Sequence, residues 1–419
     1  MPKQLAKGVW LNVIPTTQFK TISMTVDFIA PGNVQELSNR ILLAQLLETS
    51  SADYPTQTSL ARKLSMMYGA SYGVNVFRYG LQEGLRFSST IINDRFIGSE
   101  SLLSEMVKFL YSVIYRPLVT DDAFEAVTFG RQKQNLLAYL KSLNDDKQYY
   151  AEQQLSQLYF KNEPFFATSL YGDAQTIGAI SAKTLYSTYQ ELLSTNQIQI
   201  TVAGDVAEAD LVNALEEWQL KDRQVHDSEL IYRRPQDELV SKTEGQPLQQ
   251  SKLNIAYKLP VYYREADFYK ALVFNGLFGG TPISMLFKNV REKNSLAYYA
   301  SSRFDGFTGT LLVQTGIDQA NEAAVKAIIA EQLDAIAKGE FSDELLNQVV
   351  ASLINGRESR LDSQRALVNQ AMLDQLLHSS VSAPDWVKQI KRVTREDVAA
   401  IAKKVSLQAV YFLKGEDAK

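Results

Sequence analysis

Residues 181–204 read SAKTLYSTYQELLSTNQIQITVAG, and this stretch decides the fold because its pattern returns near the end of the chain. Ser181 can cap a helix whose apolar residues recur at helical spacing, and Gln197–Ala203 then reads as a buried strand. Residues 394–415, TREDVAAIAKKVSLQAVYFLKG, repeat the order, with Thr394 as the cap. The same helix and strand at the ends of two halves of similar length indicate an internal duplication.

Other parts of the two halves agree with this duplication. Thr120, followed by two aspartates, predicts the start of a helix, and Ser342 predicts the start of its counterpart in the second half. Residues 22–28 alternate between apolar and polar side chains, as a strand with one buried face does. Further predicted elements of the first half are a helix over 37–48, a hairpin of strands 74–79 and 85–91, and a helix over 100–115 that must stop before Pro117.

The sequence therefore predicts an α+β protein of two tandem homologous domains. Each domain is expected to be a mostly antiparallel sheet with helices packed on one face. Residues 221–250 are polar, carry little periodicity and contain Pro235, Gly245 and Pro247, which is typical of a linker. The predicted boundaries are 1–220 for the first domain, 221–250 for the linker and 251–419 for the second domain.

Composition excludes several classes of function. The chain has 419 residues and no cysteine, so disulfides, thiolate metal ligands and cysteine nucleophiles are absent. Its 43 basic and 47 acidic residues are interspersed, so no basic surface for nucleic acid is expected. The sequence shows neither a signal peptide nor a run of membrane-spanning length, and we expect no membrane partner and a cytoplasmic location.

The two histidines, His226 and His378, are far apart and belong to no local ligand pattern. A zinc centre is therefore hard to build from this chain alone, and we expect no metal site in it. A hydrolase that pairs a serine with one of these histidines is a weaker possibility, because His226 falls in the predicted linker and His378 in a helical, polar context.

A glycine-rich run, FNGLFGGTP, occupies residues 274–282 and precedes a short helix. Glycines before a helix can cradle phosphate, but the lysine and serine of a phosphate loop and the glycine spacing of a dinucleotide site are both missing. Thr281 as helix cap and Pro282 at the first helical position give the run a structural explanation.

The run from Gly279 to Tyr298, with Arg-Glu-Lys at 291–293 and Leu-Ala-Tyr at 296–298, resembles the second-half signature of the pitrilysin/insulinase peptidases. That family includes the mitochondrial processing peptidases. The resemblance implies a clam-like pair of domains and, for Arg291 and Tyr298, contact with the scissile region of a peptide substrate. It also implies a substrate loop, whose glycines here are Gly276, Gly279 and Gly280.

The first half departs from the family pattern. Active members carry His-x-x-Glu-His on a first-half helix, where two histidines bind zinc and the glutamate acts as general base. The matching residues here are 40–44, Arg-Ile-Leu-Leu-Ala, and the downstream ligand glutamate would fall near Ala138 and Tyr139. None of these residues can hold a catalytic zinc, which needs about three protein ligands.

The resemblance and this departure together imply a non-catalytic subunit of a heterodimeric zinc peptidase. Its partner would be a homologous subunit that holds the zinc, and its substrate an unfolded peptide, to which this chain contributes Arg291 and Tyr298. A homodimer could stand in when the partner is missing. The alternative is a peptidase-fold scaffold or peptide-binding protein with no part in catalysis.

Overall fold

The structure is a computed structural model, and it describes residues 2–98, 101–223, 225, 229–235, 238–294 and 296–416. The chain divides into two compact units, each assembled from three separate segments. Unit 1 comprises Met1–Lys141, Ser169–Leu230 and Arg360–Ser380, and unit 2 comprises Ser142–Thr168, Ile231–Ser359 and Val381–Lys419.

Unit 1 is built on a six-stranded sheet with the order β1-β2-β8-β3-β5-β4, in which β2 and β8 pair in parallel and the other neighbours are antiparallel. The strands are β1 Lys3–Ala6, β2 Val9–Pro15, β3 Thr21–Pro31, β4 Ser71–Tyr79, β5 Gln82–Ile92 and β8 Gln197–Gly204. A separate small hairpin joins β6 Val119–Thr120 and β7 Ala123–Phe124. The helices of this part are α1 Val34–Leu47, α2 Gln57–Met66, α3 Leu102–Tyr115, α4 Ala126–Leu143, α7 Ala174–Ala179, α8 Ala182–Thr195, α9 Glu208–Leu215, α13 Gln364–Leu376 and the short turns η1 Asp94–Phe96 and η2 Glu216–Trp218.

Unit 2 repeats the plan with a five-stranded sheet of order β11-β12-β10-β13-β9, in which β13 and β9 are the parallel pair. The strands are β9 Val240–Pro247, β10 Ser251–Lys258, β11 Ala297–Asp305, β12 Thr310–Ile317 and β13 Ser406–Glu416. The helices are α5 Lys147–Tyr159, α6 Pro164–Ala167, α10 Phe268–Asn275, α11 Glu322–Lys338, α12 Asp343–Leu361, α14 Ala383–Lys391 and α15 Arg395–Ala402. Two π-helical segments, η3 Gly276–Gly280 and η4 Phe287–Lys293, and the short 3-10 helix η5 Gln319–Asn321 complete this unit. The predicted α+β duplication is therefore present. In sheet order, β4, β5, β3, β8 and β2 of unit 1 correspond to β11, β12, β10, β13 and β9 of unit 2.

Sequence periodicity identified the apolar face of β3 correctly. In β3, Met24, Val26 and Phe28 are fully buried under α1 and α3, while Thr25 and Asp27 face the other side. The duplicated helix caps are also present, since Ser181 and Thr394 both accept a hydrogen bond from the backbone three residues on and form capping boxes. Among the described residues, none of the helices is both long and apolar enough to cross a membrane.

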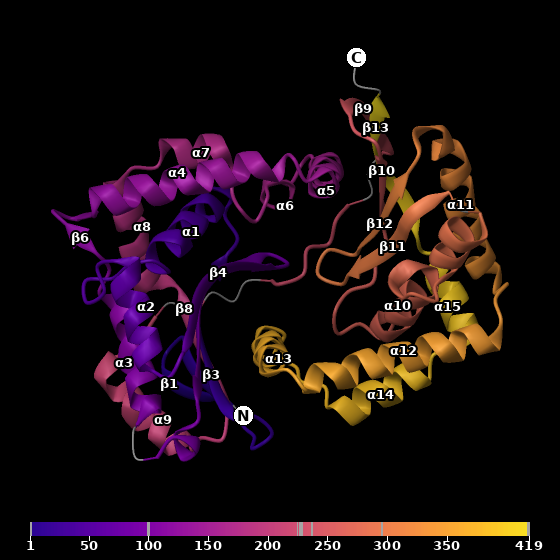
Figure 1. Cartoon of the computed structure of the whole chain (residues 1–419). Coiled ribbons are helices and arrows are strands. Elements are labelled where there is room, and N and C mark those ends of the chain that lie inside the picture. The colour runs from indigo at the N-terminus through magenta and orange to yellow at the C-terminus, as the bar shows by residue number, and fades with distance from the viewer. Residues whose placement is uncertain are drawn as a thin grey trace. The chain divides into compact units, whose positions relative to one another are not determined.

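The units do not follow the contiguous boundaries 1–220 and 251–419, because two helices are exchanged. Helix α5 comes from the first half of the sequence but packs on β10 and β13 of unit 2, and α13 comes from the second half but packs on β8 of unit 1 (Figure 1). The predicted linker 221–250 also contains β9, which pairs with β13 along its whole length. Its alternating side chains are polar because β9 is an edge strand with little buried surface.

The predicted helix start at Thr120 is wrong. Asp121 and Asp122 adopt positive φ angles of 50° and 55° and form the two-residue turn of the β6–β7 hairpin. Helix α4 begins only at Ala126, where the carboxylate of Glu125 accepts hydrogen bonds from the backbone N–H groups of residues 127 and 128. Two adjacent aspartates tolerate the left-handed conformation, so the same residues that suggest a helix start also suit this turn.

The exchange of α5 gives a prediction about stability. Leu155 is 1% exposed and lies in a cluster with sheet residues of unit 2, so Leu155→Ala should lower the free energy of unfolding by about 2–5 kcal/mol. Gln157→Ala, at an exposed position of the same helix, should change it by less than about 0.5 kcal/mol. Urea unfolding of both variants measures the difference, and equal stabilities would mean that α5 is not part of the folded core.

Candidate functional site

Helix α1 carries the positions that match the family's zinc motif. It begins after Asn33, whose side chain accepts a hydrogen bond of 2.9 Å from the backbone N–H of Gln35. Residues 40–44 lie in the middle of the helix and are all buried in unit 1. None of them has an imidazole or carboxylate, so this stretch of α1 contributes packing to the core and no metal ligand.

Arg40 is the unexpected member of this buried stretch. It is 2% exposed, its Nε lies 3.3 Å from Glu83 Oε1 on β5, and its Nη2 donates a hydrogen bond of 2.7 Å to Asn196 Oδ1. Burial raises the pKa of the Glu83 carboxyl to about 7, and the nearby Arg40 guanidinium opposes that rise. The sequence analysis missed this pair, although a single arginine inside an apolar helix face is a signal that a carboxylate partner exists.

Helix α4 carries the two positions near which the downstream ligand was expected. Ala138 and Tyr139 are both exposed, and the Tyr139 ring packs edge-on against Tyr171 with 5.5 Å between centroids. Neither side chain binds zinc, and among the described residues no group of three or more His, Cys, Asp or Glu side chains is placed to hold a metal ion.

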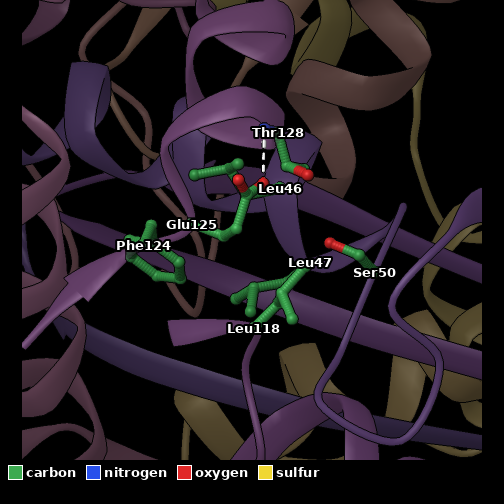
Figure 2. Close-up of a pocket in the computed structure, with 7 residues that line it drawn as sticks. All are labelled: Leu46, Leu47, Ser50, Leu118, Phe124, Glu125 and Thr128. Atoms are coloured by element: carbon green, nitrogen blue, oxygen red, sulfur yellow. Dashed lines mark hydrogen bonds between the residues drawn. The ribbon is translucent and has the colours of Figure 1, made fainter. Parts of the chain in front are cut away.

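A small cavity of about 10 Å³ lies between the C-terminal end of α1 and the start of α4. Figure 2 shows its lining, which comprises Leu46, Leu47, Ser50, Leu118, Phe124, Glu125 and Thr128. The Glu125 carboxylate is committed to the start of α4, with hydrogen bonds of 2.9 and 2.7 Å from backbone N–H groups that lower its pKa. The space suits at most one water molecule, so it is not a substrate pocket.

Strand β4 forms the outer edge of the unit 1 sheet, and α1 ties it down. The Tyr72 hydroxyl donates a hydrogen bond of 2.9 Å to the Leu47 carbonyl, and the Val74 N–H donates to the Glu48 carboxylate. Burial nonetheless raises the pKa of Glu48, because that carboxyl is partly removed from water. The Val74 N–H of this edge strand thus already has a hydrogen-bond acceptor within the chain.

Arg291 and Tyr298 belong to unit 2 and are both exposed. Arg291 lies in η4 with its guanidinium 4.8 Å from the centroid of the Phe287 ring. Tyr298 is 63% exposed and lies on β11, where the pairing register with β12 shifts between Ala297 and Tyr299. The shift is a bulge on an edge strand, a feature that locally disrupts the regular ladder at Tyr298. Arg291 and Tyr298 therefore lie on different elements, η4 and β11. Ser295, between them in the chain, lies outside the described residues.

The three glycines of the predicted substrate loop lie in or beside the core of unit 2. Gly276 and Gly279 are buried in η3, whereas Gly280 is exposed. A methyl group on Gly279 would lie 2.7 Å from the backbone N of Ser302 on β11, and one on Gly276 would lie 2.8 Å from Val349 on α12. These glycines permit close contact of η3 with β11 and α12, and so help to fix the strand that carries Tyr298.

The two histidines do not form a site in the described structure. His378 is exposed just after α13, with a left-handed backbone (φ 44°). His226 lies outside the described residues.

The arrangement defines a class of protein: a duplicated, peptidase-like α+β fold with no zinc ligands at the matching first-half positions. Residues 179–353 match the family description "Peptidase M16 inactive domain". The chain is 31% identical over 415 residues to "Probable inactive metalloprotease YmfF" of Bacillus subtilis (strain 168), and the match covers 98% of this chain and 96% of that protein.

Solved structures agree over the full length. A conserved protein from Enterococcus faecalis V583 superimposes with a TM-score of 0.95 at 38% identity, covering 100% of this chain and 99% of that one. A peptidase M16 inactive domain from Pseudomonas fluorescens has the same fold, with a TM-score of 0.81 at 16% identity and coverage of 100% and 99%. The chain belongs to the pitrilysin/insulinase peptidases, family M16, and is a homologue of its inactive members.

The buried pair of Arg40 and Glu83 predicts a pH dependence of stability. Glu83 has a pKa of about 7 in the folded protein against 4.5 ordinarily, so its protonated form stabilises the fold fully below about pH 4.5. That contribution is lost as the pH rises through 7. Glu83→Gln should remove on the order of 3 kcal/mol of the pH-dependent change in unfolding free energy between roughly pH 5 and 8, as measured by urea unfolding.

Glu244→Gln is the matched control for this prediction. The pKa of Glu244 is lowered to about 2, with hydrogen bonds from Gln246, Tyr150 and Tyr411 among the causes, so this carboxylate stays ionised over the same pH range. Glu244→Gln should therefore change the free energy of unfolding by the same amount at every pH between about 5 and 8. A Glu83→Gln protein with the same pH slope as the wild type would contradict the assignment.

The close contact at Gly279 gives a second prediction. Gly279→Ala should destabilise the protein by about 1–3 kcal/mol, because its methyl group meets the β11 backbone. Gly356→Ala is the control, since that glycine lies within α12 with open space around it and alanine favours a helix by about 1 kcal/mol. Thermal unfolding should therefore show opposite shifts, and a shift in the same direction would contradict the packing argument.

Proposed function

We propose that this chain is the non-catalytic subunit of a heterodimeric zinc peptidase. In this proposal the partner is a homologous chain that holds the zinc, and the substrate is an unfolded peptide. The absence of cysteine is compatible with the reducing cytoplasm as the site of action. The partner would hold the zinc, which would supply the activated water for hydrolysis of the peptide bond.

The observation that carries the proposal is the exposure of Tyr298 at a bulge of an edge strand. Burial does not explain an aromatic side chain that is 63% exposed, and a bulge is a common device for turning a side chain toward a ligand. Arg291 is likewise exposed, and its contact with Phe287 leaves the guanidinium accessible to solvent. Exposed polar groups of this kind are available to a substrate in a way that buried ones are not.

The proposed role of the pair is electrostatic. A tyrosine hydroxyl and a guanidinium can both donate hydrogen bonds to the oxygen of the scissile carbonyl as negative charge develops on it. Because this charge is larger in the transition state than in the bound peptide, loss of either donor should lower kcat more than it raises KM.

The test uses this chain, a zinc-bearing relative from the same organism, and the two mixed, with unfolded fluorogenic peptides as substrates. Activity should require the mixture. Arg291→Ala and Tyr298→Phe should each lower kcat of the mixture by roughly 100-fold to 1,000-fold, as loss of one oxyanion donor does. Steady-state kinetics measure both parameters.

Two variants at exposed positions serve as controls: Lys388→Ala on α14 and Tyr139→Phe on α4, which should leave kcat unchanged. If the relative is fully active alone and neither Arg291→Ala nor Tyr298→Phe alters the mixture, the chain is a scaffold and the proposed site is wrong.

A further inference from the structure

A depression of about 420 Å³ lies on unit 1, and none of the positions discussed above lines it. It is bounded by the loop after α1, by α2 and α3, and by η2. Figure 1 labels α2 and α3, and also α9, the helix that η2 follows in the chain. Its volume falls within the range of roughly 300–1,000 Å³ that is typical of pockets for small organic molecules.

One side of the depression is aromatic. Trp218 lines it and is only 5% exposed, and its ring centroid lies 6.2 Å from that of Tyr111. Tyr54 and Phe109, also in the lining, have their centroids 5.6 Å apart. The buried indole N–H of Trp218 has no hydrogen-bond partner among the described residues. This N–H has almost no solvent-accessible surface, so it is not available to a molecule bound in the depression.

Most of the charges in the lining are already paired. The carboxylate of Asp53 lies 3.1 Å from Arg116 and accepts a hydrogen bond of 2.7 Å from Ser112, and Lys63 forms an ion pair with Glu105. These pairs neutralise two acidic and two basic groups. Six side chains of the lining are charged near neutral pH, and these four contribute no net charge to the depression.

The remaining two charges are of opposite sign. Lys108 on α3 and Glu217 on η2 both line the depression, both are exposed, and neither takes part in an ion pair within the described part of the chain. A ligand that satisfies both must carry an anionic and a cationic group on a small framework.

We propose that this depression binds a small zwitterion with an apolar side chain, either a free amino acid or a dipeptide. The ligand carboxylate would lie at Lys108, its ammonium group at Glu217, and its side chain against the aromatic surface. The three acidic and three basic side chains of the lining balance, which favours a zwitterion over a polyanion such as a nucleotide. This site belongs to unit 1, whereas Arg291 and Tyr298 belong to unit 2, and it does not depend on the proposed function.

The first measurement is isothermal titration of the full chain with L-phenylalanine and with the dipeptide Phe-Phe, which distinguishes the two sources of the ligand. N-acetylphenylalanine and phenylalanine amide, which lack the ammonium and the carboxylate respectively, should bind at least tenfold more weakly than the better zwitterion. Equal affinity for all four compounds, or no binding of either zwitterion, would overturn the proposal.

Variants of the two uncompensated charges localise the binding. Lys108 and Glu217 are exposed, so the Lys108→Gln and Glu217→Gln proteins should fold normally. Each substitution should weaken zwitterion binding roughly tenfold. Lys183→Gln and Glu191→Gln, exposed on α8 outside the depression, are matched controls that should leave binding unchanged. Binding that survives both Lys108→Gln and Glu217→Gln would place the ligand elsewhere and refute the assignment.

Discussion

The constraint on which the fold depends is that each sheet has a second face that still needs a cover. In unit 1 this face includes Asp27, which is fully buried and paired with Arg86 through contacts of 2.6 and 2.8 Å. Helix α13 covers it, and Asn369 and Met372 both contact the same guanidinium. Because the second half of the sequence supplies α13 and the first half supplies α5 to unit 2, neither half contains all the segments of one unit. Both units therefore need the whole chain.

The two covering helices are held by different forces. Helix α5 presents Ala151, Leu155 and Tyr159 to apolar residues of β10, β12 and β13, so the hydrophobic effect holds it in place. Helix α13 relies more on polar contacts, such as those from Gln364 to the carbonyls of β3 and β8. Beneath α13, burial raises the pKa of Asp27 against the opposing effect of Arg86. Hydrogen bonds are worth less net free energy than apolar burial of similar extent, but they specify the position of a helix more narrowly.

The sequence alone predicted the secondary structure correctly at positions where the pattern depends on residues close along the chain. Capping residues such as Ser181 and the alternation in β3 report on neighbours a few positions away, and both were read correctly. Local signals failed at Asp121 and Asp122, because two conformations suit the same residues. They could not reveal the exchange of α5 and α13 either, since an amphipathic helix shows which face it buries but not which sheet it meets. The partner of Arg40 lies 43 positions along the chain and was hidden for the same reason.

The placement of the candidate residues separates what the fold needs from what it does not. Stability alone accounts for Arg40, because removal of either member of a buried ion pair is costly. Stability also accounts for Gly276 and Gly279, which make room for neighbouring elements. It does not account for Tyr298, because an aromatic ring largely in water adds little to folding. The residues that remain unexplained by packing therefore lie on the surface of unit 2, while the first-half positions where active relatives bind zinc have become part of a core.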